Sequence, residues 1–268
     1  MVRAALAVAA VALVTTASAA EIAAPAKLVT PGKLTYGFAA TFAPFEFQRD
    51  GKLVGVDVDF GDQIAKRLGL AAEPMNMEFK GLIPALQGGR LDIINSAMYI
   101  TQERAQQVDF VPYLRIGTEV IVRKANPAGI SGRNASLCGK RIAVTLGGIQ
   151  ENYARADDER CRNAGQPQVI VMTFPTAQDS ALAVRQGRAD VFYNSTPGTV
   201  MLMAEVPDVY QVVGETFEAN TRLGVAVRKG DEAMSKAIEA AFQSMARDGT
   251  YVRVLENWKL PASVVLLQ

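Results

Sequence analysis

Short apolar runs alternate with amphipathic segments along most of the chain. The runs are rich in Val, Ile, Leu and aromatic residues, which is typical of buried strands. They occupy residues 34–38, 91–96, 118–123, 141–145, 169–173, 191–193, 209–213 and 222–228. Between them, apolar side chains recur about four positions apart, as at Phe60, Ile64 and Leu68, which predicts helices with one buried face. The alternation predicts an α/β fold with mostly parallel sheets.

Local signals mark where several of the helices begin and end. Gly69 ends the helix that contains Phe60, and Thr176-Ala-Gln-Asp179 has the spacing of a helix start. Other helices are expected over 82–87 and 101–108, and from 149 or 150 after the Gly147-Gly148 turn. A closing amphipathic helix is expected around Met234, Ile238, Ala241, Phe242 and Met245.

A nine-residue pattern occurs twice. Residues 85–93 and 183–191 both read Ala-(Leu/Val)-x-x-Gly-Arg-x-Asp-(Ile/Val), and the strand after each ends in Asn-Ser. Gly-Arg-Asp turns between helix and strand are common, so chance is the alternative. The matched strand ends favour two similar lobes with a cleft between them, and predict equivalent places for Asn95-Ser96 and Asn194-Ser195. The extended segment at 118–123 is expected to cross from the first lobe to the second, and 222–228 to return.

The stretch from Gly81 to Arg104 predicts helix, Gly turn, strand and a loop that carries one Arg. Ligands of open α/β sheets bind beyond the carboxyl ends of the strands. Asn95, Ser96 and Arg104 are therefore placed where a small anion would be held. The alternative for Arg104 is a surface role, capping nearby carbonyls or pairing with Asp109.

The first twenty residues have the features of a secretory leader. Arg3 precedes an apolar run from Ala4 to Val14 and a small-residue segment, so we expect cleavage after Ala19 or Ala20. The run is too short to span a membrane. Its removal brings the formal net charge of +1 to zero, which leaves no basic field for nucleic acid or an anionic membrane. A periplasmic protein is expected.

The reactive side chains are few. Cys138 and Cys161 are the only cysteines, and in an oxidising compartment they are expected to form a disulfide, with a pair of free thiols as the alternative. The chain has no His, which excludes His-based triads and metal sites. No Gly-Lys-Ser/Thr phosphate loop is present either. Neither a metal nor a cofactor is expected.

Taken in order, several segments resemble the family 3 periplasmic solute-binding proteins, which serve ABC importers of polar amino acids. The matching segments are 42–47 (Phe-Ala-Pro-Phe-Glu-Phe), 51–59, 81–86, 100–104, 108–110, 226–231 and 248–251 with Trp258. The resemblance implies a two-lobe type II binding-protein fold, each lobe a mostly parallel sheet flanked by helices, joined by a two-strand hinge. Lobe 1 is expected over 27–117 and 222–268, and lobe 2 over 118–221.

The resemblance also implies a set of ligand contacts. Arg104 matches the Arg that pairs with the ligand carboxylate, a task that suits a planar guanidinium. Phe42 and Phe79 match the aromatic residues that sandwich the ligand. Hydrogen-bonding positions around the ligand are matched by Ser96, Ala97, Tyr99, Gly148, Ile149, Gln150 and Ser195. Asn95 and Asn194 join this set because they precede Ser96 and Ser195 at the two matched strand ends. Each has a plainer alternative: the Phe side chains as core, Tyr99 as a rim residue, and Asn194 and Ser195 as helix caps.

The chain departs from the family pattern in its charges. Ser195 and Ala39 stand where amino-acid binders of the family carry Asp, Ile149 replaces a Thr, and Tyr99 fills a position that is usually small. The carboxylate site is retained and the ammonium site weakened. We therefore expect an unusual amino acid, an amino-acid derivative or another small carboxylate as ligand, with a flat or apolar side group favoured.

Three functions compete. The first is a monomeric binding protein that delivers its ligand to an ABC permease in the inner membrane. The second is an accessory or sensory module for a dehydrogenase or receptor. The third is an enzyme on the same fold, similar to a periplasmic cyclohexadienyl dehydratase, with Glu46 or Glu151 as proton donor. The residue inventory favours binding over catalysis.

Overall fold

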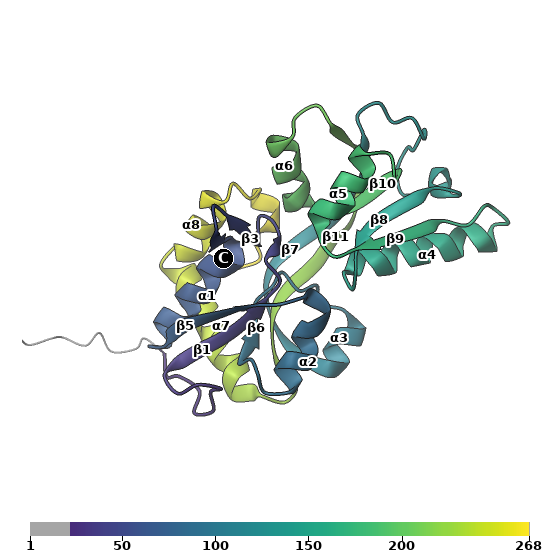
Figure 1. The fold of residues 1–268 in the computed structure, drawn as a ribbon. Coiled ribbons are helices and arrows are strands. Elements are labelled where there is room, and N and C mark those ends of the chain that lie inside the picture. Colours follow the sequence, from purple (N-terminus) through teal and green to yellow (C-terminus); the bar gives the residue numbers. More distant parts are fainter. Residues whose placement is uncertain (1–21, 268) are drawn as a thin grey trace, which may run out of the picture.

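Two long strands run side by side through the molecule. In the computed structural model, which describes residues 22–267, β7 (Val108–Arg123) and β11 (Tyr210–Arg228) pair antiparallel along most of their length (Figure 1). They lie at the centre of an eight-stranded sheet with the order β5-β1-β6-β11-β7-β10-β8-β9. Their pairing is irregular between Val213 and Thr221, where the chain passes between the two halves of the molecule. The expected leader, residues 1–20, lies outside the described residues.

The first lobe contains the N-terminal and C-terminal segments. Its strands β1 (Lys33–Phe38), β5 (Ala71–Asn76) and β6 (Ile93–Ile94) are parallel. Its helices are α1 (Val56–Arg67), η1 (Phe79–Gly81), α2 (Leu82–Gln87), α3 (Gln102–Gln107), α7 (Glu232–Arg247), α8 (Thr250–Asn257) and η3 (Ala262–Val264). A separate small sheet consists of β2 (Thr41–Phe42), β3 (Glu46–Arg49) and β4 (Lys52–Val54).

The second lobe repeats the arrangement with parallel strands at the other end of the sheet. These are β8 (Arg141–Thr145), β9 (Ile170–Phe174) and β10 (Val191–Ser195), of which β10 pairs antiparallel with β7. The helices are η2 (Ala135–Leu137), α4 (Ile149–Asn163), α5 (Ala177–Arg185) and α6 (Thr196–Glu205). The predicted start of α5 is confirmed, because the Thr176 hydroxyl accepts a hydrogen bond from the backbone N–H of Asp179 at 3.0 Å.

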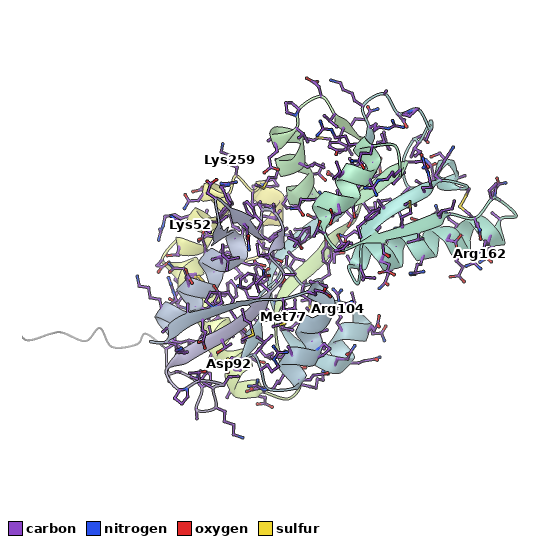
Figure 2. All side chains as sticks on the ribbon, in the orientation of Figure 1. Lys52, Met77, Asp92, Arg104, Arg162 and Lys259 are labelled. Carbon is purple, nitrogen blue, oxygen red and sulfur yellow. A yellow bond between two sulfur atoms is a disulfide. The ribbon has the colours of Figure 1, made fainter. Side chains whose placement is uncertain are left out.

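The predicted disulfide is also confirmed. Cys138 and Cys161 are bonded, with their Cα atoms 5.5 Å apart, and the bond ties the end of η2, just before β8, to the last turn of α4 (Figure 2). Cys161 is fully buried within the apolar cluster that also holds Ile142 and Val144 of β8. The cross-link therefore joins two elements of the second lobe that already pack on each other.

Two predicted strands differ in extent from the structure. The strand expected over 91–96 is only two residues long, because the Asp92 carboxylate accepts the backbone N–H groups of Val29 and Thr35 and the chain turns at Ala97, where φ is 39°. The segments predicted at 209–213 and 222–228 belong to one continuous strand, β11, since both halves pair with β7. The turn at Ala97 brings the following residues to the edge of the first lobe.

The apolar core is divided in the same way as the sheet. One cluster gathers around Phe60, Tyr113 and Phe242 in the first lobe, and another around Ile142, Val191 and Tyr193 in the second. Ile149, at the start of α4, packs into the first lobe's cluster although its helix belongs to the second. The two lobes are therefore in contact at the start of α4.

Candidate ligand-binding pocket

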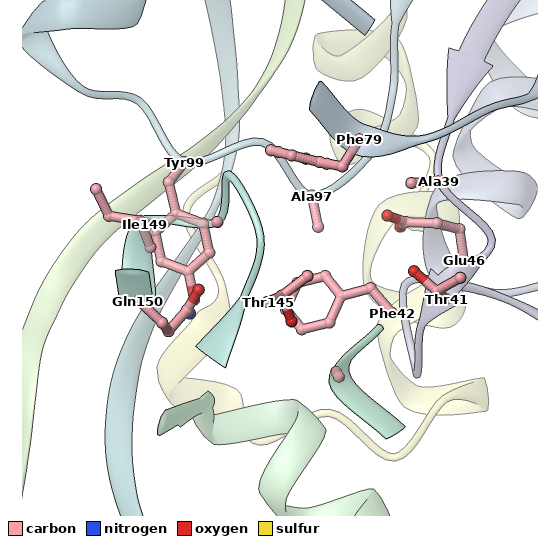
Figure 3. Close-up of a pocket in the computed structure, with 12 residues that line it drawn as sticks. Ala39, Thr41, Phe42, Glu46, Phe79, Ala97, Tyr99, Thr145, Ile149 and Gln150 are labelled. Atoms are coloured by element: carbon pink, nitrogen blue, oxygen red, sulfur yellow. The ribbon is translucent and has the colours of Figure 1, made fainter. Parts of the chain in front are cut away.

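A pocket lies where the first lobe meets the start of α4. It contains about 440 Å³ of space free of protein atoms, counted to its open mouth and including open solvent. It is lined by Ala39, Thr41, Phe42, Glu46, Phe79, Ala97, Tyr99, Thr145, Gly148, Ile149, Gln150 and Ala177 (Figure 3). Seven of the twelve predicted ligand-binding residues line it: Phe42, Phe79, Ala97, Tyr99, Gly148, Ile149 and Gln150.

Two phenylalanine rings form opposite walls of the pocket. Figure 3 shows Phe79 on one side of the space and Phe42 on the other, with Ala97 between them. Both rings are half-buried, and Phe42 rests on the fully buried Phe45, with the ring centroids 5.2 Å apart. The two rings leave apolar faces toward the pocket, which suit a flat or apolar part of a ligand.

The two residues that follow β6, Asn95 and Ser96, form hydrogen bonds to segments next to the pocket. Ser96 donates from its hydroxyl to Glu46 Oε1 at 2.8 Å and accepts from the backbone N–H of Ala39 at 3.0 Å. Asn95 donates from Nδ2 to the backbone carbonyl of Asp57 at 2.6 Å. Both side chains are fully buried and neither lines the pocket. Asn95 and Ser96, which the sequence predicted as ligand contacts, therefore lie behind the residues that line the pocket.

Arg104 lies beside the pocket and joins the two lobes. Its guanidinium donates from Nη1 to the backbone carbonyl of Tyr99 and from Nη2 to that of Gly147, both at 3.0 Å. The guanidinium carbon is 5.2 Å from the centre of the Phe79 ring, a cation–π arrangement. Arg104 does not line the pocket (Figure 2 shows its place in the fold) and is half-buried, and this burial lowers its pKa. A guanidinium nevertheless stays charged at any physiological pH.

A side-chain hydrogen bond also crosses between the lobes. Gln150, in the first turn of α4, donates from Nε2 to the Tyr99 hydroxyl at 3.0 Å, and both residues are buried. Burial raises the pKa of Tyr99, so its hydroxyl is neutral and keeps its proton for a further hydrogen bond. Together with the contact between Arg104 and Gly147, this bond holds the lobes against each other on one side of the pocket.

The pocket also faces the beginning of α4. Gly148 precedes this helix with no side-chain cap, and Gly147 takes the left-handed φ of 75° that a glycine tolerates. The Gly147 N–H donates to Glu151 Oε2 at 2.9 Å. The N-terminal end of a helix carries partial positive charge, which favours an anion there. With Arg104 nearby, this end of the pocket is its positive end.

Asn194 and Ser195 lie outside the pocket. Ser195 accepts the backbone N–H of Gly198 at 3.1 Å and caps α6, and it is fully buried. Asn194 accepts the N–H of Ser195 through Oδ1 and borders a separate hollow next to Phe192 and Met201. Their counterparts in the repeat, Asn95 and Ser96, are likewise held by neighbouring polar groups.

Five lining residues were absent from the predicted set: Ala39, Thr41, Glu46, Thr145 and Ala177. Glu46 entered only as a proton donor for the enzyme alternative, although it is fully buried and points into the pocket (Figure 3). The available signal was a lone acid between two aromatic residues in Phe45-Glu46-Phe47. Small residues such as Ala39 and Ala177 carry no sign of ligand contact in the sequence, because they line the pocket only where the two lobes approach each other.

Two further observations concern the described residues alone. None of the helices within residues 22–267 is long and apolar enough to cross a membrane. In the same range, no three acidic, Cys or His side chains come together as a metal site would require.

The sequence profile of the bacterial extracellular solute-binding proteins, family 3, matches residues 34–261, most of the chain. This chain belongs to that family. The L-cystine-binding protein TcyJ of Escherichia coli (strain K12) is 32% identical over 234 residues, covering 87% of this chain and 84% of TcyJ. The protein is therefore an extracytoplasmic solute-binding protein with the two-lobe fold that the sequence predicted.

Solved structures give the same result. An ancestral arginine-binding protein bound to glutamine is 36% identical with a TM-score of 0.77, covering 86% of this chain and 99% of the other. The ancestral amino acid-binding protein AncCDT-1, a precursor of cyclohexadienyl dehydratase, is 33% identical with a TM-score of 0.75, covering 85% and 95%. These family members are binding proteins.

Proposed function

We propose that this protein captures an amino acid or a closely related small carboxylate in the periplasm and delivers it to an ABC import permease. The observation that carries the proposal is a pocket lined from both lobes, by Phe42, Phe79 and Tyr99 of the first lobe and by Gly148 to Gln150 of the second. A ligand that touches both lobes stabilises the closed arrangement, so capture and closure are coupled. The names of the relatives, which include cystine and arginine binders, support an amino-acid ligand.

The ligand carboxylate binds at the positive end of the pocket. Arg104 donates there to two neutral carbonyls, those of Tyr99 and Gly147. A carboxylate is a stronger acceptor and matches the fork of the guanidinium, so it would displace at least one of them. The N-terminal end of α4 adds its partial positive charge.

The remaining parts of the proposal concern organisation. Lobe 1 comprises 27–117 and 222–268 and lobe 2 comprises 118–221, with β7 and β11 as the hinge. The leader is cleaved after Ala19 or Ala20, and the mature protein acts as a monomer. The division of the apolar core into separate clusters supports these lobe bounds.

We propose binding rather than catalysis. Of the two candidate proton donors, Glu151 is held by the N–H of Gly147 and by Arg155, and it does not line the pocket. Glu46 does line it, but no second titratable carboxyl among the lining residues accompanies it as a catalytic partner. Incubation with prephenate or arogenate, followed by product analysis, tests this point, and turnover would contradict it.

A thermal-shift screen tests the proposed function as a whole. Its panel contains the standard L-amino acids, L-cystine, opine-like derivatives and small dicarboxylates. A ligand at a hundred times its dissociation constant adds about 2.7 kcal/mol of stability, enough for a clear rise in Tm. A response only to neutral sugars or to cations without a carboxylate would overturn the carboxylate assignment.

A further inference from the structure

Two carboxyl groups are buried together behind the pocket. Glu46 on β3 and Asp57 on α1 are both fully buried. Asp57 accepts from the Tyr113 hydroxyl at 2.8 Å and from the backbone N–H of Ala97 at 2.5 Å. Glu46 is bonded through Oε1 to Ser96, while its Oε2 has no hydrogen-bond partner among the described residues. Within residues 22–267, no Lys or Arg forms an ion pair with either carboxyl group.

This arrangement lacks a positive charge. A buried carboxylate without a cation is costly, so the group keeps its proton instead. Burial and the neighbouring Asp57 raise the pKa of Glu46 well above its usual range, and burial raises the pKa of Asp57 to about 6. The other titratable neighbours, Tyr113 and Tyr36, are phenols whose own pKa values are raised, so they stay neutral.

The unpartnered oxygen belongs to a fully buried side chain that lines the ligand space. Glu46 is the only acidic residue that lines the pocket in the described part of the chain, and in Figure 3 its carboxyl group points toward the space between Phe42 and Phe79. The start of α4, with Ile149 and Gln150, lies toward the other end. The pocket therefore has a positive end and a carboxyl end, with apolar walls between them.

We propose that Glu46 receives a protonated amino group of the ligand through Oε2, and so supplies the countercharge that Ser195 and Ala39 do not. The inference rests on the proposed function and specifies its ligand as an amine-bearing carboxylate. The amine is either the α-amine or one at the end of the side chain, and both present the same ammonium group to the carboxyl.

Capture of such a ligand displaces a proton. The ligand enters as R–NH₃⁺, the proton that burial holds on Glu46 leaves to the buffer, and an ammonium–carboxylate pair remains, so charge is conserved. Because the proton and the ammonium compete for this carboxyl, affinity rises with pH as Glu46 loses its proton. An acid without an amine does not compete with the proton for Glu46, and it gains no affinity at the carboxyl end of the pocket.

Calorimetry with ligands on one carbon skeleton tests the inference at pH 7. L-lysine carries both amines, L-norleucine only the α-amine, 6-aminohexanoate only the terminal amine, and hexanoate none. L-cystine with 3,3′-dithiodipropionate and L-glutamine with glutaramate extend the comparison. We expect amine-bearing members to bind roughly 10- to 100-fold more tightly, the range for a charge-assisted hydrogen bond in a buried site. Their heats should differ between phosphate and Tris because a proton is released.

The variant Glu46→Gln should remove both the amine preference and the proton release. Asp62→Asn is the control, since Asp62 is an exposed acid of α1 with a raised pKa that does not line the pocket. Equal affinity for amine-bearing and amine-free acids in every pair, measured on the unmodified protein, overturns the inference and leaves the proposed function intact. An amine preference that survives in folded Glu46→Gln also overturns it. Failure of every carboxylate in both panels overturns the proposed function itself.

Discussion

At the residue scale, the proposed site depends on one basic and one acidic side chain. Arg104 bonds to two backbone carbonyls on one side, and Glu46 presents an unpartnered oxygen on the other. Resemblance predicted the role of the first, whereas the second follows from burial and packing. The two charges make different contributions, because Arg104 is half-exposed and stays charged, while Glu46 is enclosed and titrates.

Replacing Arg104 by Ala is expected to weaken ligand binding by about 100-fold or more, because two charge-assisted hydrogen bonds to the carboxylate are lost. The apo Tm should change little, since the side chain is half-exposed and its partners are carbonyls near solvent. Calorimetry with the best ligand from the thermal-shift screen measures the first effect and differential scanning calorimetry the second. Arg90→Ala, at an exposed position of the same lobe, is the control. A large drop in apo Tm would assign Arg104 a structural role.

Replacing Glu46 by Gln should change the pH dependence of stability. A carboxyl whose folded pKa is raised stabilises the protein below its unfolded pKa, near 4.5, and this contribution is lost as pH rises toward the folded value. Relative to the unmodified protein, Glu46→Gln should therefore gain stability from pH 5 to pH 8. Urea denaturation at both pH values measures the difference. A stability of Glu46→Gln that falls relative to the unmodified protein from pH 5 to pH 8 would contradict the assignment.

At the element scale, short segments with local signals form as predicted. Thr176 caps α5, Gly147 turns the chain before α4, and Cys138 is bonded to Cys161. Each depends on residues near in sequence or on simple pairing. The strand expected over 91–96 is shorter than predicted. Its length depends on its backbone pairing with the distant strands β1 and β11, which a local pattern does not show.

Removing the disulfide should destabilise the second lobe. The bond closes a loop with a sequence separation of 23, for which the chain-entropy estimate is about 3 kcal/mol. The double variant Cys138→Ser, Cys161→Ser should therefore have a lower Tm and a lower midpoint in urea. Ligand affinity of the folded variant should stay unchanged, because neither residue lines the pocket. A Tm equal to that of the unmodified protein would show that packing alone holds α4 on β8.

At the scale of the whole molecule, contacts between the lobes determine how closure is coupled to binding. Ile149 packs into the first lobe's apolar cluster, and Tyr99 and Arg104 form hydrogen bonds to residues of the second lobe. These contacts exist only when the lobes meet. They should raise the population of the closed form, and so the apparent affinity for any ligand that needs it.

Removing the hydroxyl of Tyr99 tests this coupling. In Tyr99→Phe, the hydrogen bond from Gln150 is lost, and affinity should fall up to about tenfold, as expected for one neutral hydrogen bond. Small-angle scattering should show a larger radius for the apo variant. Tyr210→Phe is the matched control, because its hydroxyl bonds to the Ala181 carbonyl within the second lobe. It should lower Tm without changing affinity, and an equal loss of affinity in both variants would refute the coupling.

The sequence by itself determined the alternation of strands and helices, the helix starts, the disulfide, the two-lobe fold and seven of the pocket's lining residues. These follow from local periodicity, turn chemistry and an ordered set of motifs. Only the tertiary structure decided that Glu46 faces the ligand space, that Asn95 and Ser96 lie behind its wall, and that Ser195 caps a helix. Such placements depend on how segments far apart in the sequence pack against one another. A local pattern does not show which distant residues will surround a given side chain.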